Sequence, residues 1–137
     1  MKKFANYIDG KLVTPKSKDY LDNYNPATGE VYSLLPDSSH EDVEEAVAAA
    51  KRAFPGWSAL TPGERSQYLI KIADAVELCQ AELALAETTD TGKPLWLSNA
   101  MDIPRAAANF RFFGHGITQF ASESHLEDGV ALNYTRR

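Results

Sequence analysis

Residues 42–77 read DVEEAVAAAKRAFPGWSALTPGERSQYLIKIADAVE, and they carry two amphipathic helical patterns that a single break separates. Ser39 and Asp42 have the spacing of a capping box at the start of the first pattern. Thr61 and Glu64 repeat this spacing at the start of the second, with a proline at the first helical position. We therefore predict two consecutive helices, each with a defined beginning.

The apolar residues of the two patterns recur at the spacing of a helix. They are Val43, Ala46, Val47, Ala50 and Phe54 in the first pattern, and Leu69, Ile72, Ala73, Val76, Cys79 and Leu83 in the second. We predict that the proline and glycine at residues 55–56 end the first helix and that the second runs to about Thr88. Cys79, the only cysteine, should be a buried and inert thiol that forms neither a disulfide nor a metal site.

Upstream of the helices the sequence is typical of strands. Asp9-Gly10 lies between two short β-prone runs over residues 6–13, which predicts a hairpin. A second pair of runs, Tyr20–Asn25 and Glu30–Pro36, is joined by PATG at residues 26–29. Proline early and glycine late favour a tight turn there, so a second hairpin is expected.

Downstream of the helices, the glycine and proline of TGKP at residues 91–94 should end the second helix. A short helical turn is expected over residues 95–100. Asp102 has the position of an N-cap, and a longer helix is predicted over residues 103–121. In that helix Phe112 and Phe113 should pack in the core, and Arg111 should lie on the surface or between domains.

The last residues, VALNYTRR at 130–137, alternate as a strand does, but we find no partner strand or turn for it. A chain that stops inside such a segment is expected to be a fragment of a longer protein. The predicted fold class is α/β: β-hairpins, then three to four helices, then a terminal strand.

Composition excludes several classes of protein. With 44% hydrophobic and 24% charged residues the chain is neither disordered nor membrane-like, and no apolar run approaches the length of a transmembrane helix. A net charge of −5 with scattered basic residues argues against binding to nucleic acid. The histidines lack metal-ligand spacing, and no secretory leader is evident, so we expect a cytoplasmic protein without a membrane partner.

Five segments together resemble a known family. They read YIDGKLV, YNPATGEVYSLLP, DVEEAVAAAKRAFPGWSALTPGERSQYLIKIADAVE, LALAETTDTGKPL and ALNYTRR. In this order and spacing the chain resembles the N-terminal portion of the NAD(P)-dependent aldehyde dehydrogenases. Neither glycine turn has the spacing of a phosphate-binding loop.

The resemblance implies how the chain is divided. Residues 1–123 would form the N-terminal part of the NAD(P)-binding domain, and residues 124–137 would begin the oligomerisation arm of a homodimer or homotetramer. The nucleophilic cysteine, the general-base glutamate, the oxyanion-stabilising asparagine and the cofactor turn would all lie beyond Arg137. No catalytic or cofactor-binding residue is therefore expected in this chain, and NAD cannot be distinguished from NADP.

One segment, MDIPRAAANFRFF at residues 101–113, resembles the subgroup that oxidises 2-aminomuconic and 2-hydroxymuconic semialdehydes. The start of this helix borders the aldehyde tunnel in the family, which makes Arg105 a candidate for binding the carboxylate at the far end of the substrate. Arg105 could instead be a solvated residue of the first turn, paired with Asp102.

Asp90 is a second candidate. Some members of the family bind a structural monovalent cation with this aspartate and with the backbone oxygen that corresponds to Tyr24, and a carboxylate beside the free carbonyls of a helix end suits a cation. The alternative is that Asp90 only caps the loop.

The resemblance implies an enzyme that oxidises an aldehyde, such as a carboxylated semialdehyde, to the acid with NAD or NADP. The chain alone should be inactive. Two alternatives remain at this point: a non-enzymatic truncated family member that acts as an assembly module, and an unrelated small α+β domain.

Overall fold

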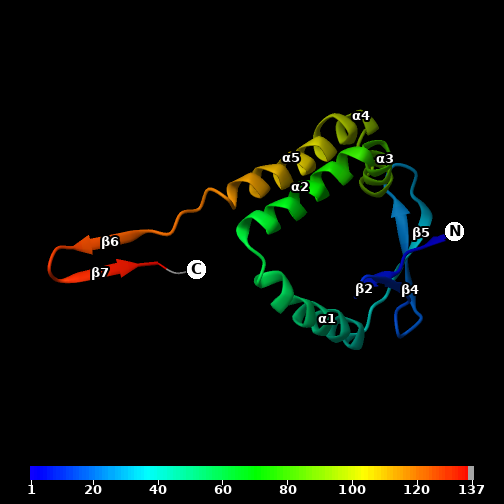
Figure 1. Cartoon of the computed structure of the whole chain (residues 1–137). Helices are drawn as coiled ribbons and strands as arrows, with labels where there is room; N and C mark the ends of the chain where they lie inside the picture. The colour runs from blue at the N-terminus through cyan, green and yellow to red at the C-terminus, as the bar shows by residue number, and fades with distance from the viewer. Residues whose placement is uncertain (136–137) are drawn as a thin grey trace.

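Strands come first, helices follow and a hairpin comes last in residues 1–135, the part of the chain that this computed structural model describes (Figure 1). The N-terminal strands are β1 (Lys2–Lys3), β2 (Asn6–Ile8), β3 (Lys11–Val13), β4 (Tyr20–Asn25) and β5 (Glu30–Pro36). The helices are α1 (His40–Ser58), α2 (Pro62–Leu78), α3 (Gln80–Thr91), α4 (Leu95–Leu97), the π-helix η1 (Ser98–Asp102) and α5 (Ile103–Gly116). The last strands are β6 (Ser124–Glu127) and β7 (Ala131–Tyr134). This order confirms the predicted α/β class.

Both N-terminal hairpins form where the sequence predicts them. The turn between β2 and β3 has positive φ at both residues, 52° at Asp9 and 74° at Gly10, as a tight hairpin turn requires. Strands β4 and β5 pair in antiparallel fashion, and β1 joins β5 in parallel. The resulting sheet has the strand order β1-β5-β4.

A bulge interrupts the pairing of β4 with β5. Asn23 pairs with Ser33 and Tyr24 pairs with Val31, so Tyr32 is the additional residue of β5. Bulges change the direction of the side chains around them. As a result the neighbouring hydroxyl oxygens of Tyr32 and Ser33 both lie within hydrogen-bond distance of Asn23 Nδ2, at 2.9 and 3.2 Å.

Helix α1 begins with the predicted capping box and ends later than predicted. Ser39 N–H donates to Asp42 Oδ2 at 2.8 Å, and Asp42 N–H points back to Ser39 Oγ at 3.4 Å. The prediction that Pro55-Gly56 ends the helix was wrong, since α1 continues to Ser58. A proline in the last turn removes one hydrogen bond only, and Ala59 N–H still reaches the Pro55 carbonyl at 3.2 Å.

The second predicted helix is divided into α2 and α3. The Thr61 capping box forms as predicted, but the backbone leaves the helical region at Cys79, where φ is −98° and ψ is 15°. This break moves Cys79 off the apolar stripe, and the thiol is exposed. The prediction of a buried cysteine was therefore wrong, because it assumed one unbroken helix.

Helix α5 continues from η1 without a cap. Asp102 has helical φ and ψ of −69° and −50° and caps nothing with its side chain, so its prediction as an N-cap was wrong. The helix also ends at Gly116 rather than near residue 121. It packs along α2, where a Cβ atom placed on Gly114 would lie 3.0 Å from Ile70 Cδ1.

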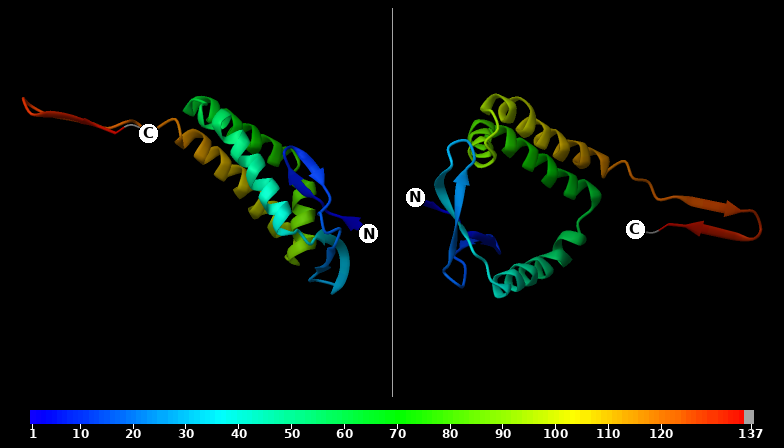
Figure 2. Two further views of the ribbon diagram at one scale, coloured as in Figure 1. Left: turned by 90° about the horizontal axis from the view of Figure 1, so that it is seen from below. Right: turned by 180° about the vertical axis from the view of Figure 1, so that it is seen from behind.

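The C-terminal segment forms a hairpin and not a lone strand. Strands β6 and β7 pair from Ser124 with Tyr134 to Glu127 with Ala131, around a turn in which Gly129 has φ of 72°. The prediction that this strand has no partner was therefore wrong. Figures 1 and 2 show the hairpin leading away from the end of α5, and all its strand residues are exposed. Arg136 and Arg137, the end of the predicted strand, lie outside the described residues.

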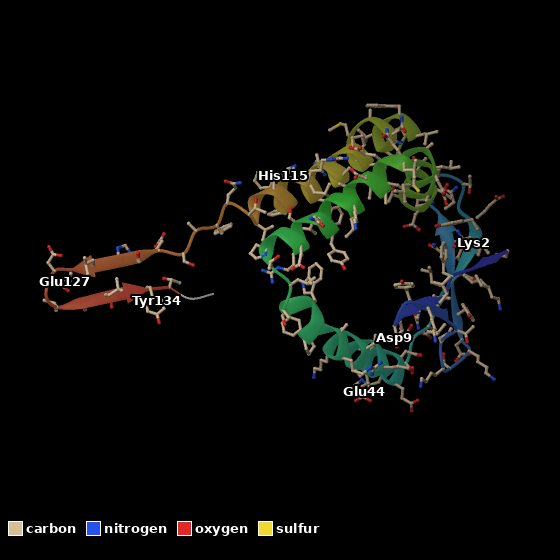
Figure 3. All side chains as sticks on the ribbon, viewed as in Figure 1. Lys2, Asp9, Glu44, His115, Glu127 and Tyr134 are labelled. Atoms are coloured by element: carbon tan, nitrogen blue, oxygen red, sulfur yellow. The ribbon has the colours of Figure 1, made fainter. Side chains whose placement is uncertain are left out.

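Small residues make up most of the buried core, and large apolar residues remain exposed. The buried apolar residues are Ile8, Ala49, Ala73, Ala84 and Ala107. By contrast Phe112 and Phe113 are 70% and 64% exposed, so the prediction that they pack in the core was wrong. Figure 3 shows side chains of α1 and α2 reaching into the space that the helices and strands surround. Within the described part of the chain, every helix is too short or too polar to cross a membrane.

Candidate functional site

The candidate site lies where the loop after α3 leads through α4 and η1 into α5. Gly92 ends α3 in the left-handed conformation, with φ of 75°. A Cβ atom on Gly92 would lie 3.1 Å from Pro26 Cβ. Glycine is therefore required at this position for two reasons, the left-handed φ and the close approach of Pro26. It lets this loop rest against the turn between β4 and β5.

Lys93 forms an ion-pair bridge at the beginning of this loop. Its Nζ donates to Asp102 Oδ2 at 2.8 Å and to Glu87 Oε1 at 2.7 Å. The hydrogen bond with Asp102 and then that with Glu87 raise the pKa of Lys93 above 10.5. Lys93 thus joins α3 to the end of η1, and it was not among the residues that the sequence singled out.

Arg105 lies one residue after Pro104, in the first turn of α5. Its side chain is exposed, and within residues 1–135 it makes no hydrogen bond or ion pair. The predicted alternative partner, Asp102, bonds to Lys93 instead. The π-helix directly before α5 is a rare feature that is frequent at functional sites.

Asp90 and its partners form a second cluster, where the last turn of α3 meets strands β4 and β5. Asp90 Oδ1 accepts from the Tyr32 hydroxyl at 2.6 Å and from Asn23 Nδ2 at 3.1 Å. The bond from Tyr32, followed by that from Asn23, lowers the pKa of Asp90, and the same bond raises the pKa of Tyr32. Sequence reasoning missed both donors, since the bulge that aims Tyr32 has no sequence signal.

The structure brings Asp90 to β4 as the cation hypothesis requires, but its side-chain partner there is Asn23, the neighbour of Tyr24. The side chain of Tyr24 is half exposed and does not bond to Asp90 in the described residues. No group of three or more acidic, histidine or cysteine side chains in residues 1–135 could hold a metal ion. A cation at Asp90 would therefore depend on backbone oxygens.

A hollow of about 570 Å³ lies between the sheet and α3. Asn23, Tyr32, Asp90 and Glu87 line it, together with apolar residues that include Leu83 and Ile103. Arg105 is not part of its lining. The Asp90 cluster and the Arg105 position are therefore separate sites.

Arg111 forms ion pairs with two acidic residues of α2. Its guanidinium donates to Asp74 Oδ1 at 2.6 Å, to Glu77 Oε2 at 2.8 Å and to Glu77 Oε1. All three bonds cross from α5 to α2, so Arg111 holds these helices in register. The Arg111 side chain is partly exposed, and its guanidinium is bonded to carboxylates of α2.

Comparison with known proteins identifies the family. The aldehyde dehydrogenase family matches residues 12–137. The chain is 50% identical over 133 residues to 2-aminomuconic semialdehyde dehydrogenase of Bos taurus, with 96% of this chain and 27% of that protein covered. It is 38% identical to 5-carboxymethyl-2-hydroxymuconate semialdehyde dehydrogenase of Escherichia coli, with 98% and 28% covered. The chain belongs to the aldehyde dehydrogenase family.

Solved structures support the same assignment. PnpE in complex with nicotinamide adenine dinucleotide matches with a TM-score of 0.89 and 40% identity, over 96% of this chain and 27% of that one. The NAD⁺ complex of an aldehyde dehydrogenase from Bacillus cereus matches with a TM-score of 0.92 and 31% identity, over 98% and 28%. The chain thus spans about a quarter of its relatives' length, and its fold is the N-terminal portion of the aldehyde dehydrogenase fold.

Proposed function

We propose that this chain is the N-terminal part of an enzyme that oxidises a carboxylated semialdehyde to the corresponding acid with NAD or NADP. 2-Aminomuconic and 2-hydroxymuconic semialdehydes are the substrates that we favour. The observation that carries this proposal is Arg105, an exposed guanidinium at the start of α5 without a protein carboxylate in residues 1–135. The printed names of two relatives, both semialdehyde dehydrogenases, support it.

The role of Arg105 follows from its chemistry. A guanidinium offers a planar pair of N–H donors that matches the two oxygens of a carboxylate, and bonds of this kind are stronger than neutral ones. Bound at its carboxylate end, the substrate would extend its aldehyde away from α5. A neutral aldehyde would gain nothing from Arg105, so this residue would select for charged substrates.

Within residues 1–135, the glycine turns do not fit the phosphates of a dinucleotide. Neither turn has the spacing of a phosphate-binding loop, and the one at Gly92 rests against Pro26, 3.1 Å from where a Cβ atom would lie. When bound, the cofactor would accept the hydride from the substrate, and we place its site, with the catalytic cysteine, glutamate and asparagine, beyond Arg137. Residues 1–137 alone should therefore produce no NADH from an aldehyde.

The remaining assignments extend the proposal. Residues 1–123 would belong to the NAD(P)-binding domain, and residues 124–137 would begin the arm that joins subunits of a homodimer or homotetramer in the cytoplasm. A monovalent cation would bind at Asp90 and the Tyr24 carbonyl. The alternative is a truncated module that binds full-length subunits through the exposed β6–β7 hairpin.

The test compares kcat/KM of the whole dehydrogenase with and without Arg105→Ala. We expect a loss on the order of 2 kcal/mol in transition-state stabilisation with 2-hydroxymuconic semialdehyde, and none with an uncharged aldehyde of similar size. Arg52→Ala, which removes an exposed arginine from α1, is the matched control. An equal loss on both aldehydes would contradict the proposal.

A further inference from the structure

We infer that Lys93 is a positioning residue that keeps the Asp102 carboxylate away from Arg105, and so leaves Arg105 free to bind a substrate carboxylate. This inference rests on the proposed function. It adds a specificity-determining residue that would not touch the substrate. Lys93 acts only through the partner that it gives to Asp102.

The competition arises from helix geometry. Asp102 precedes Arg105 by three residues, and the backbone is helical from η1 into α5. Side chains three residues apart on a helix are neighbours, and an acid and a base at this spacing attract each other. Without another partner, Asp102 would therefore bind Arg105 and occupy its donors.

The structure contains that other partner. Lys93 Nζ lies 2.8 Å from Asp102 Oδ2 and 2.7 Å from Glu87 Oε1. The side chains of Lys93, Asp102 and Glu87 are 28%, 26% and 37% exposed, so solvent screens their attraction less than at an open surface. Arg105 is exposed and makes no bond to this cluster within residues 1–135, whereas Lys93 is held by two carboxylates at once.

The backbone keeps Lys93 at this position. Gly92 on one side is left-handed, with φ of 75°, and rests on Pro26. Pro94 on the other side is extended, with φ of −60° and ψ of 137°. Because both neighbours are restricted, the backbone at Lys93 loses little further conformational freedom when the ion pairs form.

Loss of Lys93 would have two consequences for Arg105. Asp102 would be left partly buried without a cation, and Arg105 is the nearest basic residue along its helix. The cluster of Lys93, Glu87 and Asp102 would also change from one net negative charge to two. Both the pairing of Asp102 with Arg105 and the added negative charge would weaken binding of an anionic substrate. Only the pairing requires the Asp102 side chain in particular.

The experiment uses the whole dehydrogenase and separates these effects. With Lys93→Met we expect KM for 2-hydroxymuconic semialdehyde to rise roughly fivefold, equivalent to an ion pair of about 1 kcal/mol, with kcat little changed. KM for an uncharged aldehyde of similar size should stay the same. Lys93→Met combined with Asp102→Asn should restore the original KM. Lys93→Met combined with Glu87→Gln, which has the same charge as that double variant, should not.

Asp102→Asn alone provides a test that does not depend on the folding of a Lys93 variant. It should leave KM for the charged aldehyde equal or lower, and KM for the uncharged aldehyde unchanged. The inference is overturned if Lys93→Met changes KM for the two aldehydes equally, or changes neither. It is also overturned if both double variants restore KM, or if Asp102→Asn raises KM for the charged substrate. A selective effect of Arg105→Ala without one of Lys93→Met would overturn this inference alone. An unselective effect of Arg105→Ala would overturn the proposed function.

Discussion

The Tyr32 hydroxyl donates a hydrogen bond to Asp90 Oδ1 over 2.6 Å, and this bond joins strand β5 to the last turn of helix α3. A carboxylate at the C-terminal end of a helix is repelled by the helix dipole. Asp90 is therefore stabilised by its two donors, Tyr32 and Asn23, rather than by its own helix. The contact fixes how the sheet and α3 meet at the hollow between them.

Removal of the Tyr32 hydroxyl should loosen this junction. We expect Tyr32→Phe to lower the local free energy of opening of α3 by about 1 kcal/mol, which is less than the roughly 1.5–3 kcal/mol typical of a bond to a charged group because the site is open to solvent. Hydrogen exchange of the α3 amides in the whole protein, followed by mass spectrometry, should accelerate about fivefold. Tyr24→Phe, on the same hairpin but without a bond to Asp90, is the control, and equal acceleration in both variants would contradict the prediction.

The capping carboxylate of α1 should make stability depend on pH. The Ser39 backbone N–H above all, then the Ser39 hydroxyl and the Lys16 backbone N–H, hold the pKa of Asp42 below its ordinary value of 3.8. The folded chain therefore binds fewer protons at Asp42 than the unfolded chain does. This contribution to stability is complete above the unfolded pKa and is lost as the pH falls through the lower, folded pKa.

The measurement is the Tm of wild-type protein and of Asp42→Asn between pH 7 and pH 3. Wild type should have the higher Tm at neutral pH. The difference should begin to shrink near the unfolded pKa, at about pH 4, where Asp42 of the unfolded chain takes up a proton while the folded carboxylate is still ionised, and it should go on shrinking toward the lower, folded pKa. Asp22→Asn, at an exposed position on β4, should show no such convergence. A difference in Tm that is the same at every pH would mean that the charge of Asp42 has no part in the cap.

Local signals in the sequence were sufficient to predict most of the secondary structure. The capping boxes at Ser39 and Thr61 and the Asp9-Gly10 turn act within a few residues, so they can be recognised without the fold. The β6–β7 hairpin had the same signal in Asp128-Gly129, and it could have been predicted on that ground. The break at Cys79 has no glycine or proline to mark it, so no local signal in the sequence predicts it.

The site was less predictable, because its contacts join residues far apart in the chain. Arg105 was identified through resemblance alone. Tyr32 and Asp90 are separated by 58 residues, and Arg111 and Glu77 by 34. The sequence offered several acids for each base at comparable spacings, so the choice of Lys93 over Arg105 as the partner of Asp102 depends on the path of the loop at Gly92.

Two glycines of α5, Gly114 and Gly116, differ in how closely they approach other residues. A Cβ atom on Gly114 would lie 3.0 Å from Ile70 Cδ1 and 3.3 Å from Leu69 Cβ, whereas one on Gly116 would meet nothing within 4 Å. Alanine is favoured over glycine in a helix by up to about 1 kcal/mol, but overpacking typically costs about 1–3 kcal/mol. We therefore expect Gly114→Ala to lower the Tm of the whole protein and Gly116→Ala to leave it equal or raise it. If Gly114→Ala raised the Tm as well, α2 and α5 would have to be packed less closely at Ile70 than these distances require.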